Sequence, residues 1–227
     1  MADDKGKKAP PAKARRYAVS QNEVGLQYYG EWEMERAIDA FQEAVAADPD
    51  NPEYHLNLAR AYARSSDFDK AMRSLGDYLR TETDENVASR YERLFSSALD
   101  SVEEVLIEKM RELDFPMQQI GKAIQMWLEY RITVGRRPLR VPKPALWSAA
   151  LTHAVAKINM SDLKRKDVAA AYGVAETSLQ EKYDQLVTTL DLMPADFRYF
   201  AGEENPLDKL VEAAQMLEEM YGRFREE

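Results

Sequence analysis

Two histidines, His55 and His153, are the side chains in this sequence best suited to acid–base chemistry or metal ligation, because the 227-residue chain contains no cysteine. A transition-metal site usually needs three or four imidazole, thiolate or carboxylate ligands, so a multi-histidine or thiolate site is excluded. His153 lies in a run of small and apolar residues with helical spacing, and His55 occupies a position predicted to be in the core. We therefore expect both histidines to be structural, and the sequence predicts no metal and no cofactor.

Carboxylate pairs are present but badly placed for catalysis. Glu103 and Glu104, like Glu218 and Glu219, are neighbours in sequence, and adjacent residues on a helix do not face each other. A serine or threonine nucleophile needs a positioned base. The glycines are not followed by the Lys-Ser or Lys-Thr pair of a phosphate-binding loop. The sequence predicts a protein that is not an enzyme.

The formal net charge of −9 is unevenly distributed along the chain. Residues 1–16 carry a net +4, residues 17–115 a net −12, residues 116–200 a net +4 and residues 201–227 a net −5. Such asymmetry indicates charged partners, and clustered cations bind phosphates with release of counterions. The residues predicted to form a nucleic-acid or acidic-partner surface are Arg136, Arg137, Arg140, Lys143, Lys164, Arg165, Lys166, Gln180 and Lys182.

Residues 1–16 are rich in lysine, proline and alanine, and we expect a disordered basic arm. They contain no apolar segment, so they are not a signal peptide. No stretch of the chain reaches the roughly 18 apolar residues of a membrane-spanning helix. The absence of cysteine fits a reducing compartment. The sequence predicts a cytoplasmic protein that does not span a membrane.

The elements that must position these side chains are helices that repeat with an offset of 34 residues. In each repeat a small residue, Gly25 or Ala59, marks the close approach of two helices. An alanine also stands four residues before a bulky apolar residue on the same helical face. The offset aligns Val24 with Leu58, Gly25 with Ala59, Tyr28 with Tyr62, Ala37 with Ala71, Phe41 with Leu75, and Ala44 with Tyr78.

This pattern resembles the tetratricopeptide repeat (TPR) over about residues 18–85. The first unit carries the resemblance at Gly25, Tyr28, Ala37, Phe41, Ala44 and Pro49. The resemblance implies a short α–α superhelix whose first helices line a groove for a peptide or a partner helix. The groove residues that it implies are Asn22, Leu26, Tyr29, Asn57, Arg60, Arg64 and Arg90. This mixture favours a segment that is both apolar and acidic; alternatively, the repeats only scaffold or dimerise.

Two repeats bury little core by themselves and need a cap. Residues 85–113 show one long helical stripe of apolar residues with one polar break, which we interpret as a capping helix. The predicted first domain is therefore residues 17–114, with two TPR-like repeats followed by this helix.

Residues 115–200 are predicted to form a second helical domain, with a helix-turn-helix at about residues 163–190. Its signals are Ala169 at the helix crossing, Gly173 for a turn with positive φ, and Leu179 as an apolar anchor. With the preceding "LWSAAL" helix it resembles the cyclin-type repeats of initiation factor B and small uncharacterised bacterial domains. The outward carboxylates Glu176 and Glu181 oppose entry into a major groove. The alternative is that the basic surface docks a protein or packs on the chain's own acidic segments.

Residues 201–227 predict an amphipathic helix that begins at Asn205 and Pro206. Its apolar stripe packs on its own domain or on a second copy, which would make a homodimer. Together the patterns predict an all-α, non-enzymatic adaptor that binds a protein partner through a TPR groove and docks through the helix-turn-helix domain. The alternative is a DNA-binding, transcription-related regulator whose repeats recruit a partner.

Overall fold

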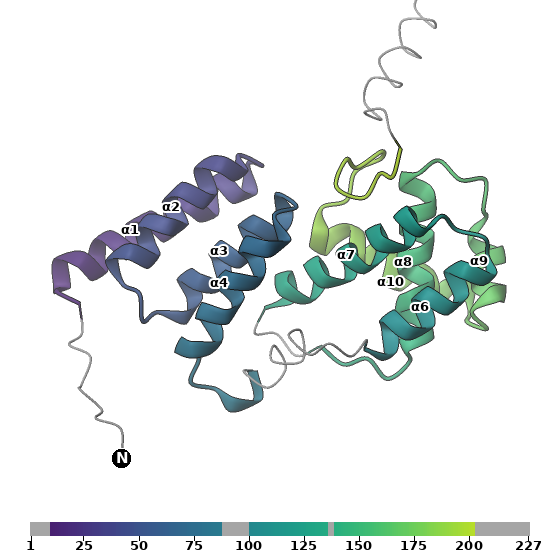
Figure 1. The fold of residues 1–227 in the computed structure, drawn as a ribbon, viewed down its shortest axis with the longest axis horizontal. Helices are drawn as coiled ribbons and strands as arrows, with labels where there is room; N and C mark the ends of the chain where they lie inside the picture. The colour runs from purple at the N-terminus through teal and green to yellow at the C-terminus, as the bar shows by residue number, and fades with distance from the viewer. Residues whose placement is uncertain (1–9, 88–99, 136–138, 203–227) are drawn as a thin grey trace, which may run out of the picture. The chain divides into compact units, whose positions relative to one another are not determined.

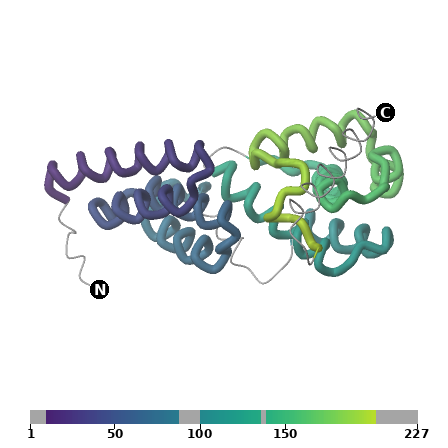
Figure 2. The backbone as a smooth tube through the Cα atoms, turned by 90° about the horizontal axis from the view of Figure 1, so that it is seen from above, coloured from purple at the N-terminus to yellow at the C-terminus, as the bar shows by residue number. Residues whose placement is uncertain are grey.

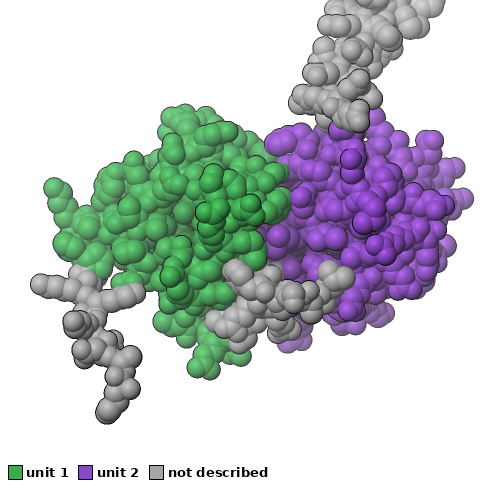
Figure 3. Space-filling model, in the orientation of Figure 1, with its two compact units in different colours: residues 1–96 green, residues 97–227 purple. Residues whose placement is uncertain are grey.

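The computed structural model describes residues 10–87, 100–135 and 139–202, and all regular structure in these ranges is α-helical (Figure 1). The predicted all-α class is therefore confirmed. The chain forms two compact units, Met1–Ser96 (unit 1) and Ser97–Glu227 (unit 2), which Figure 3 shows in green and purple. No helix in the described part of the chain is long and apolar enough to cross a membrane.

Unit 1 contains two helical hairpins in its described part. The first hairpin pairs α1 with α2, the second pairs α3 with α4, and α2 also contacts α3. Figure 2 shows α1, in purple, lying alongside α2. The helices of unit 1 that lie wholly in its described part are α1 (Ala12–Gly30), α2 (Met34–Ala47), α3 (Pro52–Arg64) and α4 (Phe68–Thr81).

The turns of the two hairpins have the same backbone conformation. Trp32 and Ser66 occupy equivalent positions in the 34-residue repeat, and their φ angles are +62° and +63°. In each turn the following amide donates to the carbonyl of a tyrosine five residues earlier: Glu33 to Tyr28 at 3.0 Å, and Asp67 to Tyr62 at 2.9 Å. The repeat seen in the side-chain pattern is therefore also present in the backbone.

Gly25 allows the closest approach within the first hairpin. A Cβ atom added at Gly25 would lie 2.6 Å from ring carbons of Phe41, which is too close for any side chain. The equivalent residue of the second repeat is Ala59, which is fully buried, and there Leu75 replaces the aromatic ring. The small residue at the helix crossing therefore has the predicted packing role in both repeats.

α1 begins earlier than the sequence predicts. Residues 1–16 were expected to form a disordered arm, whereas α1 starts at Ala12, directly after Pro11. Residues 12–16 are alanine, lysine and arginine, which are good helix formers, and no glycine or proline interrupts them. The prediction was wrong for residues 12–16, because it gave the composition of the whole segment more weight than the helix propensity of these five residues. Residues 1–9 lie outside the described residues.

Unit 2 is organised around α8 in its described part. α8 contacts α6, α7, α9 and α10, and its small residues allow this close packing. The ring of Trp147 on α8 forms a cluster with the rings of Trp127 and Tyr130 on α7, with centroids 4.8–5.7 Å apart. The helices in the described part of unit 2 are α6 (Ser101–Glu112), α7 (Met117–Val134), α8 (Pro144–Ile158), α9 (Arg165–Ala171) and α10 (Glu176–Leu190).

The predicted domain boundary between residues 114 and 115 needs correction, because α6 packs on α7 and α8 and belongs to unit 2. Asp100 anchors its first turn: its side chain accepts from the amides of Val102 and Glu103, and Glu103 completes a capping box. The same carboxylate accepts from Nε1 of Trp127 at 2.8 Å and from Arg131. Residues 101–112 therefore belong to unit 2 rather than to the predicted first domain, and residues 88–99 lie outside the described residues.

α9 and α10 are joined by the turn that the sequence predicts. Gly173 has a φ of +61°, Ala169 is 4% exposed and Leu179 is fully buried. Ala175 is at the N-terminal cap of α10 and provides no side-chain hydrogen bond. Both helices pack on α8, and the helix-turn-helix itself stays a prediction.

A buried ionic cluster fixes the segment after α10. Arg198 is 2% exposed and donates to Glu129 on α7 at 2.6 Å and to Asp196 at 2.7 Å. Tyr199 donates to the other oxygen of Glu129 at 2.5 Å. Burial opposes the charge of Arg198, but its hydrogen bonds to Asp196 and the nearby Glu129 carboxylate hold its pKa above its usual value. The predicted helix of residues 205–227 lies outside the described residues.

Candidate functional site

The side chains of Asn22 and Asn57 join α1 to α3. Nδ2 of Asn57 donates to Oδ1 of Asn22 at 2.9 Å, and Oδ1 of Asn57 accepts from Nη1 of Arg60 at 2.9 Å. Asn22 is 7% exposed and Asn57 is 2% exposed, so these predicted groove residues lie inside the unit. Buried amides must satisfy their hydrogen bonds within the protein. We therefore assign them the role of holding the two helices together.

Arg64 is also inside unit 1, at 6% exposure. Its guanidinium carbon lies 4.4 Å from the centroids of both the Tyr29 and the Trp32 rings. These cation–π contacts stabilise a charge that has little access to water. The prediction that Arg64 faces a partner directly is therefore corrected, because its cation is covered by the aromatic rings of the first hairpin. Arg90, the last predicted groove residue, lies outside the described residues.

The accessible predicted groove residues are Leu26, Tyr29 and Arg60. Leu26 is 44% exposed, and Tyr29 and Arg60 are half-buried. Val19, at 48% exposure, joins them because residues 19, 22 and 26 are three and four positions apart and share one face of α1. Val19 and Leu26 thus flank Asn22 where α1 meets α3. The term α1–α3 surface is used below for Val19, Leu26, Tyr29 and Arg60.

The first turns of α1 extend this surface. A hollow of about 370 Å³ adjoins Val19, and the described residues that line it are Ala12, Arg15, Arg16 and Val19. Both arginines are exposed. The sequence analysis missed this extension because residues 12–16 were assigned to the arm; the signal was the run of helix formers after Pro11. The surface therefore offers apolar side chains with cations at both ends, and one exposed carboxylate, Glu23, between them.

The predicted basic surface of unit 2 is partly occupied by contacts within the unit. Arg165 donates to Glu176 at 2.8 Å and also to Gln180, and Gln180 in turn donates to Asp184 at 2.6 Å. Lys182 lies 4.7 Å from the centroid of the Trp147 ring. The side-chain amide of Gln180 is therefore already bonded to two side chains of its own unit. The remaining described members of the surface, all exposed, are Arg140, Lys143, Lys164 and Lys166; Arg136 and Arg137 lie outside the described residues.

Both histidines are buried. Nε2 of His55 lies 2.7 Å from the carbonyl of Pro49, and the ring of His153 packs edge-on against Tyr183 with centroids 5.0 Å apart. Burial, with added repulsion from Lys157, lowers the pKa of His153 to about 4. Neither histidine lies in a group of three or more residues that could hold a metal ion, within the ranges that the structure describes.

Comparison with known proteins supports the repeat and leaves the second unit unassigned. The family model of the tetratricopeptide repeat matches residues 31–94. The TPR resemblance is therefore confirmed for that segment, which includes α2, α3 and α4. No curated protein and no solved structure matches the chain. The resemblance of the second half to a cyclin-type domain stays a prediction.

Proposed function

We propose that the chain is a non-enzymatic adaptor whose unit 1 binds an apolar, acidic segment of a partner protein on the α1–α3 surface. The observation that carries this proposal is the exposure of Val19 and Leu26 on either side of the buried Asn22, beside the cation of Arg60. TPR repeats generally mediate protein–protein interaction, which supports the same conclusion.

Apolar contact supplies the driving force in this proposal. Side chains that are nearly half exposed in the free protein release water when a partner covers them. Each Å² of apolar surface buried in this way contributes about 25 cal/mol to the free energy of binding. The bond between Asn22 and Asn57 holds α1 against α3 before the partner arrives. A surface that is already ordered loses less conformational entropy on binding, so more of this energy appears as affinity.

Arg60 supplies the preference for an acidic partner. Nη1 of Arg60 is used by Asn57, whereas Nε is buried and has no hydrogen-bond partner among the described residues. A carboxylate that accepts from this guanidinium would form a charge-assisted bond. Arg15 and Arg16 extend the positive surface at the other end of the apolar strip. Because residues 17–115 carry a net −12, the preference must come from these local contacts rather than from long-range attraction.

A peptide selection on the full-length chain tests the proposal. A random dodecapeptide phage library would be panned on the wild type and, in parallel, on a Val19→Asp/Leu26→Asp variant. We expect peptides enriched on the wild type to combine leucine, isoleucine or phenylalanine with aspartate or glutamate. The variant should enrich no such peptides, because charge replaces the apolar strip.

The matched control is Val24→Asp, a valine on α1 that is 37% exposed and two positions from Leu26, on the opposite side of the helix. This variant should still enrich the acidic, apolar peptides. Circular dichroism would show that all three proteins remain folded. Equal enrichment on the wild type and on the Val19→Asp/Leu26→Asp variant would refute the assignment of the surface.

A further inference from the structure

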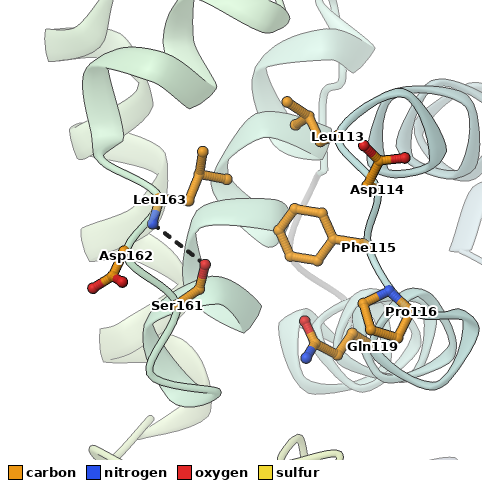
Figure 4. Close-up of a pocket in the computed structure, with 8 residues that line it drawn as sticks. All are labelled: Leu113, Asp114, Phe115, Pro116, Gln119, Ser161, Asp162 and Leu163. Carbon is orange, nitrogen blue, oxygen red and sulfur yellow. Dashed lines mark hydrogen bonds between the residues drawn. The ribbon is translucent and has the colours of Figure 1, made fainter.

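A second surface feature lies in unit 2, where the corner between α6 and α7 meets the corner between α8 and α9. These two corners enclose a hollow of about 450 Å³. Figure 4 shows the ring of Phe115 pointing from the first corner towards the second, with Leu113 and Leu163 beside it. The lining is completed by Asp114, Pro116, Gln119, Ser161 and Asp162.

The floor of this hollow is apolar and only partly covered. Leu113, Phe115 and Leu163 are half-buried and pack against the core of unit 2. Immediately next to the lining in sequence are Met117 and Met160, which are 64% and 54% exposed. Methionine is a flexible and polarisable side chain that suits binding surfaces. The two corners therefore carry an apolar floor and, next to it in sequence, two exposed and flexible methionines.

The rim of the hollow is acidic. Asp114 and Asp162 are both exposed, and within the described ranges neither side-chain carboxylate forms a hydrogen bond or an ion pair. In Figure 4 they lie on opposite sides of the Phe115 ring. Among the described residues that line the hollow there is no lysine or arginine, although the exposed Arg111 and Lys164 are close in sequence. A ligand that fits must therefore be apolar at its centre and positively charged at its ends.

We propose that this hollow binds a partner segment in which an apolar side chain stands between basic residues. The apolar side chain covers the Phe115 ring, and its basic neighbours reach Asp114 on one side and Asp162 on the other. The aliphatic stems of lysine and arginine add apolar contact with Met117 and Met160 while their charges stay in water. The charge preference is opposite to that of the α1–α3 surface, so the two surfaces take different segments.

NMR spectroscopy of the full-length chain with ¹³C-methyl-labelled methionine tests this site. The probe is the peptide acetyl-Arg-Ala-Leu-Ala-Arg-amide, and its neutral match carries citrulline in place of both arginines. We expect saturable shifts of the Met117 and Met160 methyl signals with the arginine peptide. The neutral peptide should bind at least about threefold more weakly, because exposed ion pairs contribute little individually.

Variants locate the binding. Asp114→Asn/Asp162→Asn should raise the Kd of the arginine peptide about fivefold, and Lys164→Gln should lower it. Asp167→Asn removes an exposed carboxylate of α9 outside the lining and should change the Kd less than twofold. The proposal would be overturned by an absence of saturable shifts or by equal affinity for both peptides. It would also be overturned if Asp167→Asn raised the Kd as much as Asp114→Asn/Asp162→Asn. Leu26→Asp should leave these shifts unchanged, so the outcome is independent of the function proposed for unit 1.

Discussion

Asn57 on α3 donates a hydrogen bond to Asn22 on α1 over 2.9 Å, and this buried pair lies between the exposed side chains of Val19 and Leu26. The bond therefore connects the stability of unit 1 to its proposed binding surface. It also places Arg60 on α3, which donates to the same Asn57 side chain, beside the apolar strip of α1.

The first prediction concerns this amide pair. Asn57→Ala should lower the free energy of unfolding of unit 1 by about 1–3 kcal/mol, because Asn22 would remain buried without its partner. Hydrogen exchange measured on peptides from α1 and α3 would report this loss locally. Gln27→Ala, which removes an exposed hydrogen bond to Glu31 on α1, should cost less than about 0.5 kcal/mol. Equal protection in the two variants would contradict the role given to the pair.

The second prediction concerns the helix crossing at Gly25. Gly25→Ala should destabilise unit 1 by about 1–3 kcal/mol, because the new methyl group would overlap the Phe41 ring. Gly30→Ala, at the end of the same helix and with no neighbouring atom in the way, should be neutral or slightly stabilising. Urea denaturation would measure both. Adding Phe41→Leu should recover part of the loss at Gly25, and its failure to do so would show that the overlap is not the cause.

The repeat could be predicted because its signals are local and occur twice. Gly25 and Ala59 mark the same helix crossing 34 positions apart, and the turns at Trp32 and Ser66 follow the same register. The domain boundary could not be predicted, because the apolar stripe of residues 85–113 continues past it with a single polar position, Lys109. Periodicity gives the face of a helix that is buried, but it does not give the neighbour that buries it.

The candidate surface was only partly predictable. The TPR pattern identified Leu26 and Arg60, but it also selected Asn22, Asn57 and Arg64, which are buried. Polar side chains at these positions would stay accessible to solvent unless other side chains supplied the contacts that let them be buried. Their actual partners, an amide on the neighbouring helix and the aromatic rings of the first hairpin, depend on tertiary packing. No pattern within one helix contains that information.

The third prediction concerns the buried cluster in unit 2. Arg198→Met should cost about 3–5 kcal/mol, because two buried carboxylates, Glu129 and Asp196, would lose their cation. Glu129→Gln should cost clearly less, because Arg198 keeps its pair with Asp196. Glu176→Gln, which removes the exposed pair with Arg165, serves as the control and should have little effect. Urea denaturation followed by tryptophan fluorescence would measure the loss of stability in each variant. A larger loss for Glu129→Gln than for Arg198→Met would contradict this account.

The fourth prediction concerns pH. The pKa of His153 is about 4 in the folded chain and about 6.5 when unfolded. Between these values the unfolded state binds the extra proton, so stability falls as the pH decreases from 7 towards 4. His153→Leu should reduce the loss of unfolding free energy between pH 7 and pH 5 by about 2 kcal/mol.

Urea denaturation at these two pH values checks the fourth prediction. Lys157→Gln should reduce the loss as well, because Lys157 contributes to the low pKa of His153. Parallel losses in the wild type and in His153→Leu would show that this histidine does not cause the pH dependence.

The most direct test of the proposed function is a titration of one selected peptide. The acidic, apolar peptide most enriched on the wild type would be labelled with fluorescein, and its anisotropy measured against the wild type, Leu26→Asp and Val24→Asp. We predict that Leu26→Asp raises the Kd at least about tenfold, which corresponds to about 1.4 kcal/mol, whereas Val24→Asp changes it less than about twofold. Equal affinity of the three proteins would contradict binding on the α1–α3 surface.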